Sequence, residues 1–89
     1  MKIKKGFVIE KVGDSYLACA TGKLAAEFSG FVRMNETGAF LWNTLDSRSC
    51  ENEAELAAVL ASEYGVEVDV VEKDVAAFLT ELRNNGILE

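Results

Sequence analysis

Three short apolar runs in the first 34 residues predict the strands of a small sheet. Residues 7–12 and 16–20 are rich in β-branched, aromatic and other apolar side chains, and the turn residues 13–14 (Gly-Asp) separate them. A glycine in that turn supplies the positive φ that a tight hairpin requires. Residues 29–30 (Ser-Gly) mark another turn, and a third run follows at residues 31–34. The pattern predicts a three-stranded antiparallel meander.

The rest of the chain predicts three amphipathic helices. The first covers residues 36–45 and follows Asn35, a good helix N-cap. The second begins near Asn52, with a glutamate three residues later in capping-box spacing. It runs to Tyr64 and stops at Gly65, since a glycine commonly takes the left-handed position after a helix.

The third predicted helix starts at Asp69 and ends at residues 85–86 (Asn-Gly), after which residues 87–88 return the terminus to the domain. Its apolar residues form one stripe of Val71, Val75, Phe78, Leu79 and Leu82. We expect each helix to pack one face against the sheet. The chain is therefore predicted to be an α+β domain, a three-stranded antiparallel sheet followed by three helices, which has the parts of a winged-helix fold.

Length and composition predict a single cytoplasmic domain that covers residues 1–89. No apolar segment approaches the roughly 20 residues of a membrane span, and the basic N-terminus lacks the apolar core of a signal peptide. Cys19 and Cys50 stand far apart in a chain without histidine. This pattern does not suit a structural zinc site, so we interpret both as ordinary buried or half-buried cysteines.

Charge is unevenly distributed along the chain. Residues 1–34 hold six basic and three acidic side chains, a net charge of +3. Residues 35–89 hold twelve acidic and three basic side chains, a net charge of −9. A solvated acidic surface on the helices, which keeps a small protein in solution, accounts for most of this difference.

The residues of the chain do not suggest catalysis. Without histidine, the commonest general base at neutral pH is missing, and no serine has an imidazole to activate it. The glycines are scattered and form no phosphate-binding loop. Carboxylate pairs such as Glu53 and Glu55 are two residues apart, which points them in different directions on a helix. We predict that the protein is not an enzyme and holds no metal ion.

Two residues of the first helix need a separate explanation. Gly38 lies in its first turn, where glycine costs about 1 kcal/mol relative to alanine. The favoured explanation is a close approach of the helix to the preceding strand, and the alternative is contact with a ligand. Trp42 is interpreted as an anchor in the core or at its rim rather than as a platform for a ligand.

Two binding hypotheses remain from the residues alone. A winged-helix fold suggests DNA recognition or a regulatory protein-interaction module. DNA affinity, however, comes largely from basic side chains at the phosphates. The second helix has no basic residue, and the third has only Lys73 and Arg83 among several acids. The other hypothesis is peptide capture by strand addition to a sheet edge, although the sequence does not show which strand is the free edge.

The chain resembles the PqqD family, small leader-peptide-binding proteins also called RiPP recognition elements. The resemblance covers essentially the whole chain, and the hairpin is its least specific part. It rests on the order and spacing of Met34-Asn35-Glu36-Thr37-Gly38-Ala39, Phe40-Leu41-Trp42, Leu45, Glu63-Tyr64-Gly65, Asp74-Val75, Phe78, Leu82 and Gly86-Ile87-Leu88.

The resemblance implies a non-catalytic peptide chaperone that binds the leader of a ribosomally made precursor peptide. The leader would lie as an added strand along the third strand, with the third helix as the other wall of its groove. The strand wall would be Phe31, Val32, Arg33 and Met34, and the helix wall Val70, Val71, Asp74, Ala77, Phe78 and Glu81. For Phe78 a role in the core is favoured over one in the groove.

The same resemblance implies a partner enzyme and no cofactor in the module itself. The partner would be a radical S-adenosylmethionine (SAM) enzyme or another peptide-modifying enzyme. In pyrroloquinoline quinone (PQQ) biosynthesis it is an iron–sulfur protein, but nothing in the sequence selects that pathway. We expect no nucleic-acid or membrane partner. An unoccupied strand edge predicts a monomer with a weak tendency to dimerise edge to edge.

Overall fold

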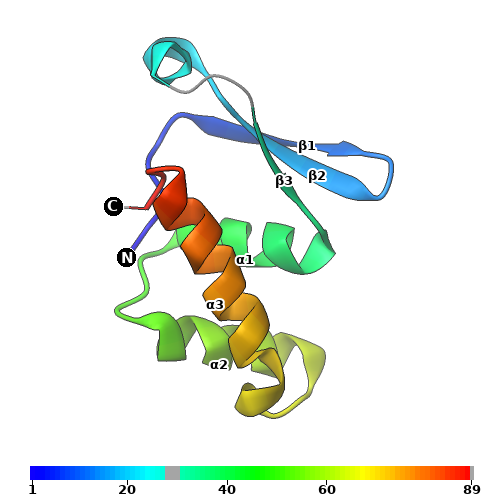
Figure 1. The fold of residues 1–89 in the computed structure, drawn as a ribbon. Coiled ribbons are helices and arrows are strands. Elements are labelled where there is room, and N and C mark those ends of the chain that lie inside the picture. The colour runs from blue at the N-terminus through cyan, green and yellow to red at the C-terminus, as the bar shows by residue number, and fades with distance from the viewer. Residues whose placement is uncertain (28–30, 89) are drawn as a thin grey trace.

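The chain folds as an antiparallel sheet followed by helices, which confirms the predicted α+β class (Figure 1). A computed structural model describes residues 1–27 and 31–88. The strands are β1 (Phe7–Val12), β2 (Ser15–Ala20) and β3 (Phe31–Met34), and the helices are α1 (Glu36–Ser47), α2 (Glu53–Tyr64) and α3 (Val68–Asn84). A short 3₁₀ helix η1 (Gly22–Ala26) follows β2 and was not predicted, because five residues are too few to show a helical period.

A two-residue turn connects β1 to β2 as predicted. Val12 pairs with Ser15, which leaves only Gly13 and Asp14 in the turn. Gly13 has φ 62°, and Asp14 has a negative φ, the combination of a type II′ hairpin turn. The turn predicted at residues 29–30 lies outside the described residues.

Local capping interactions set the starts of α1 and α2. The Asn35 side-chain oxygen accepts a hydrogen bond from the Gly38 backbone N–H at 2.8 Å, and Asn52 does the same for Glu55 at 2.9 Å. The Glu55 carboxylate accepts in turn from the Glu51 backbone N–H at 3.0 Å, one residue before the cap. Each asparagine satisfies an N–H that the helix leaves unpaired, which confirms both predicted N-caps.

The predicted start of the third helix was wrong by a small margin. Helix α3 begins at Val68, its N-cap is Glu67, and no side chain caps it. Asp69 lies inside the first turn, where a carboxylate is also favoured by the helix dipole, so a capping residue and a first-turn acid give similar sequence signals. The predicted end is confirmed, because Asn85 is the C-cap and Gly86 has φ 69°.

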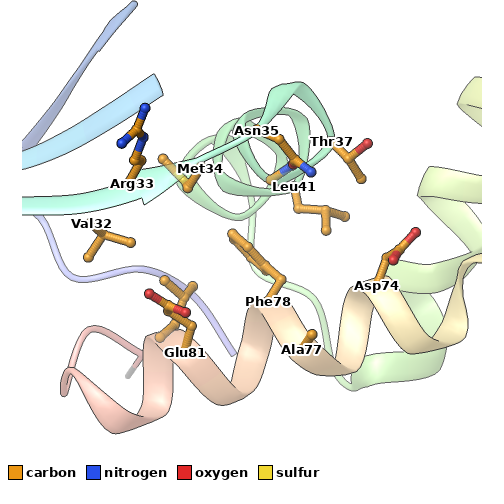
Figure 2. A pocket seen from close by; sticks show the side chains of 12 residues that line it. Val32, Arg33, Met34, Asn35, Thr37, Leu41, Asp74, Ala77, Phe78 and Glu81 are labelled. Atoms are coloured by element: carbon orange, nitrogen blue, oxygen red, sulfur yellow. The ribbon is translucent and has the colours of Figure 1, made fainter. Parts of the chain in front are cut away.

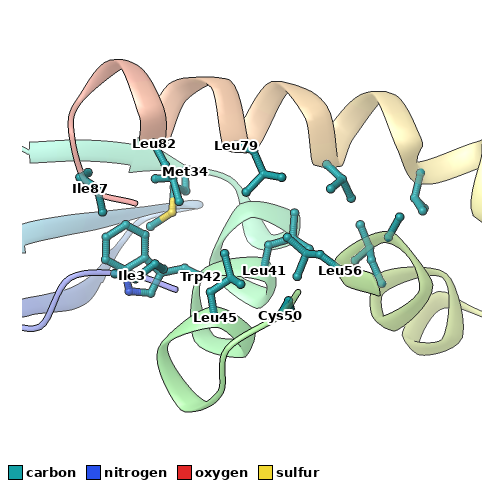
Figure 3. Packing of buried hydrophobic residues seen from close by; sticks show 14 of the residues in the cluster. Ile3, Met34, Leu41, Trp42, Leu45, Cys50, Leu56, Leu79, Leu82 and Ile87 are labelled. Carbon is teal, nitrogen blue, oxygen red and sulfur yellow. The ribbon is translucent and has the colours of Figure 1, made fainter. Parts of the chain in front are cut away.

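One apolar core joins the sheet to the helices and the chain ends (Figure 3). The Lys4 backbone N–H donates to the Ile87 carbonyl at 3.0 Å, and Ile3 pairs with Leu88, so the predicted return of the terminus is confirmed. The largest fully buried side chains are Trp42, Ile3, Leu41, Leu45, Leu56, Leu60, Leu79, Leu82, Ile87, Val75 and Cys50. Cys50 is buried and Cys19 is half-buried, which confirms their interpretation as ordinary buried or half-buried cysteines, and both are free. Burial raises the pKa of the Cys50 thiol.

Helix α2 does not pack against the sheet, which contradicts the expectation that every helix does. Its main contact is with α3, and it lies on the side of α1 and α3 away from the strands (Figure 1). Its buried stripe, which includes Leu56 and Leu60, contributes to the core from that side. An amphipathic face shows that a helix is half-buried but does not show which element covers it.

Trp42 and Gly38 fix α1 against the sheet. Trp42 is 2% exposed, and its ring meets Phe7 of β1 edge-on with centroids 5.4 Å apart, so its interpretation as a core anchor is confirmed. A Cβ added to Gly38 would lie 3.0 Å from the Met34 Cβ. The close approach of helix to strand therefore explains this glycine.

We expect Gly38→Ala to destabilise the protein by about 1 kcal/mol, although alanine is the better helix former. The added methyl group meets the Met34 Cβ, which cannot move without shifting β3. Asn43→Ala is the matched control, because Asn43 is an exposed position of the same helix. Alanine there raises the helix propensity without bringing a methyl group against another element. Urea unfolding measures both. A Gly38→Ala protein as stable as the parent would contradict the close approach.

Candidate functional site

An open groove of about 280 Å³ lies between β3 and α3 (Figure 2). Asn35 caps α1 directly after β3, and β3 and α3 lie across the groove from each other (Figure 2). The lining comes from β3 and the cap (Val32, Arg33, Met34, Asn35), from α1 (Thr37, Gly38, Leu41) and from α3 (Asp74, Ala77, Phe78, Glu81, Leu82).

Strand β3 forms one edge of the sheet beside this groove. The strand order is β1-β2-β3, so β2 is central, and within the described residues no strand pairs with the outer side of β3. An unpaired edge presents a row of free N–H and C=O groups that an extended peptide can use.

The register shows which groups of β3 face outward. The two residues that flank a two-residue turn exchange both of their hydrogen bonds, and the pairs then alternate along the ladder. Val12 and Ser15 are that pair, so every second residue of β2 from Ser15 onward bonds to β1. The residues between them, Tyr16 and Ala18, therefore bond to β3.

The partners of these two residues on β3 are Met34 and Val32, which use their backbone groups inside the sheet. Phe31 and Arg33 alternate with them, so their N–H and C=O groups point to the open edge. The side chains follow the same alternation, since Val32 and Met34 are buried and Phe31 and Arg33 are exposed.

The groove combines an apolar floor with charges on the α3 side. Val32, Met34, Leu41 and Leu82 are buried, and Phe78 is half-buried and projects from α3 toward β3 (Figure 2). Asp74 and Glu81 are exposed on α3. This arrangement suits an extended segment that pairs its backbone with β3 and places an apolar side chain over Phe78.

Comparison with known families gives a match over most of the chain. The family model described as coenzyme PQQ synthesis protein D (PqqD) matches residues 20–88. This chain belongs to the PqqD family. The match to PqqD includes β3 and all three helices, and hence both walls of the groove, while β1 and nearly all of β2 lie outside it. The family resemblance inferred from the sequence is confirmed.

The fold of this PqqD-family chain also occurs in a solved structure, that of TbiB1 in complex with the TbiA(beta) leader peptide. The likeness covers 100% of this chain and 95% of that chain, with a TM-score of 0.68 and 24% sequence identity. At this identity the likeness establishes a shared fold. A search of curated proteins gave no match to the chain.

The structure brings together most of the site residues predicted from the PqqD resemblance. The seven that line the groove are Val32, Arg33, Met34, Asp74, Ala77, Phe78 and Glu81. Phe78 also packs against the core, so this residue belongs to both the core and the groove. Phe31 lies on the same strand, with its side chain on the face of the sheet opposite the core.

Two predicted positions on α3 lie outside the groove lining. Val71 is 4% exposed and belongs to the core, on the side of α3 turned inward. Val70 is 64% exposed, one helical turn before Asp74. Neighbouring positions on a helix are about 100° apart, so one faces the core and the next faces solvent.

Five groove residues were not predicted as site residues. Asn35, Thr37 and Gly38 form the corner between β3 and α1, and Leu41 and Leu82 contribute to the apolar floor. The unusual glycine at position 38 was the available signal for the corner. Leu82 follows Phe78 by four positions, so it shares the same face of α3.

Other kinds of site were sought in the described ranges. Residues 1–27 and 31–88 contain no cluster of three or more histidine, cysteine, aspartate or glutamate residues able to hold a metal ion. Among these same residues, no helix has the length and apolar character needed to cross a membrane.

Proposed function

We propose that this protein binds the leader segment of a ribosomally made precursor peptide as a fourth strand on the outer edge of β3. The observation that carries the proposal is the free edge itself, where the backbone groups of Phe31 and Arg33 point outward beside a groove with an apolar floor. A strand added to a sheet lies about 4.8 Å from its neighbour. The leader would therefore occupy the space between β3 and α3.

The comparisons support this proposal. The chain belongs to the PqqD family, and TbiB1, which shares its fold, was solved with a leader peptide. In strand addition the main chain provides affinity, and pockets for alternate side chains provide specificity. Phe78 and the buried residues around it offer such a pocket beside the edge.

We further propose that the protein is a non-catalytic chaperone that acts in the cytoplasm and presents the bound precursor to a modifying enzyme. A radical SAM enzyme, as in pyrroloquinoline quinone biosynthesis, is the partner that the family favours; another peptide-modifying enzyme is the alternative. The chain offers no histidine as a general base, so the chemistry is assigned to the partner. A precursor held by its leader keeps the rest of the peptide available to that enzyme.

The proposal is tested by calorimetric titration with a short precursor peptide identified by inspecting the genes that neighbour the one for this protein. We expect the synthetic leader half to bind with a one-to-one stoichiometry and the other half of the same precursor not to bind. Equal binding of both halves, or of neither, would refute leader recognition.

We expect the free protein to be a monomer that pairs weakly through the exposed edge of β3, and the leader to compete with this pairing. Sedimentation velocity over a range of protein concentrations measures the association with and without leader peptide. A tight dimer that leader peptide leaves unchanged would show that the two do not share the edge.

A further inference from the structure

The charges that border the groove distinguish between classes of leader. Asp74 and Glu81 lie on α3 on either side of Phe78, and all three line the groove (Figure 2). Both acidic residues are exposed. In the part of the chain that the structure describes, neither carboxylate takes part in an ion pair or a hydrogen bond. Both are therefore available to a ligand.

The basic side chain at the groove does not neutralise them. Arg33 is the only basic residue among the described lining residues, and its Nε donates to the Ser15 hydroxyl at 3.0 Å. Figure 2 shows its side chain directed away from α3. The wall formed by α3 therefore presents two negative charges to an incoming peptide, and Arg33 contributes its backbone to the edge.

The spacing of the two acids matches alternate positions of an extended peptide. Seven positions on a helix separate Asp74 from Glu81, a distance of about 10.5 Å along the axis. Side chains on one face of a strand recur about every 6.6 Å, so residues i and i+4 are about 13 Å apart. The flexible stems of lysine or arginine cover the remaining difference, and residue i+2 falls over Phe78 between them.

We infer that the leader carries a large apolar residue flanked two positions away on each side by lysine or arginine. The apolar residue enters the groove over Phe78, and the two basic residues contact Asp74 and Glu81. This inference rests on the proposed function, because it assumes strand addition to β3. Acidic residues at the flanking positions would lie beside like charges and would be rejected.

Two short synthetic peptides test the inference. In both peptides threonine occupies every second position. The three residues between the threonines share one face of the extended peptide, and the middle one of the three is leucine. The flanking same-face residues are lysines in one peptide and glutamates in the other. We expect the lysine peptide to bind at least roughly tenfold more tightly, since each exposed charge pair changes affinity by up to about fivefold and attraction replaces repulsion at two positions.

Charge reversal in the protein identifies the residues responsible. The double variant Asp74→Lys/Glu81→Lys is expected to prefer the glutamate peptide. The control variant Glu63→Lys/Glu72→Lys makes the same change in net charge at exposed helix positions outside the groove, and it keeps the preference of the parent. Circular dichroism confirms folding of each variant. Higher salt narrows the preference, because exposed charges are screened.

The inference is overturned if the parent binds both peptides equally, prefers the glutamate peptide or binds neither. A control variant that changes the preference as much as the groove variant also overturns it. The proposed function is assessed separately with the natural leader and Arg33→Pro. A leader that depends on the edge of β3 but is indifferent to Asp74→Lys/Glu81→Lys would leave strand addition intact and remove only the charge preference.

Discussion

We expect Arg33→Pro to leave the domain folded and to weaken leader binding at least roughly tenfold, or about 1.4 kcal/mol. The Arg33 N–H points to the open edge of β3, so proline removes a donor that the sheet itself does not use. Proline is tolerated at such an edge position. The substitution therefore weakens the binding of the incoming strand and leaves the stability of the fold largely unchanged.

Val32→Pro is the matched control, one residue away on the same strand. The Val32 backbone bonds to Ala18 inside the sheet, and its side chain is buried. Proline there removes an interior ladder bond and adds strain, so we expect a loss of about 3 kcal/mol or more in the free energy of unfolding. Circular dichroism with urea measures folding, and calorimetric titration measures binding. If both variants stay folded and bind leader as the parent does, β3 is not the docking edge.

We expect Trp42→Ala to lower the free energy of unfolding by about 3–5 kcal/mol. The indole is 2% exposed and packs edge-on against Phe7, so its removal leaves a cavity between α1 and the sheet. A small domain has a total stability of only about 5–15 kcal/mol, so this single change removes a large part of it.

Phe31→Ala is the control for this aromatic deletion. Phe31 is 62% exposed on β3, and its truncation is expected to cost less than about 1 kcal/mol. Urea unfolding of the two variants measures the difference. Similar losses for Trp42→Ala and Phe31→Ala would contradict the placement of Trp42 in the core.

The elements that could be predicted from the sequence are those with local causes. Asn35 and Asn52 cap helices through contacts within three residues, and Gly65 ends α2 with φ 66°. Gly13 makes the hairpin turn by the same kind of local requirement. Local causes leave their signature within a few residues, so the pattern along the chain was sufficient.

The errors and gaps concern packing between distant segments. The apolar stripe of α2 showed that the helix is half-buried, but not that α3 covers it. On α3, Val70 and Val71 are similar in chemistry, and only the position of the helix over the core separates them. The sequence also left open which N–H groups of residues 31–34 face outward, because that depends on the β1–β2 turn and the pairing of β2 with β3.

The central claim is that leader peptide adds a strand to β3, and hydrogen exchange of the β3 amides, followed by nuclear magnetic resonance, tests it most directly. In the free protein we expect slow exchange at Val32 and Met34, which bond within the sheet, and fast exchange at Phe31 and Arg33. Saturating leader peptide is predicted to slow the exchange of Phe31 and Arg33 as their N–H groups bond to the added strand. Fast exchange at both residues in the saturated complex would contradict strand addition at this edge.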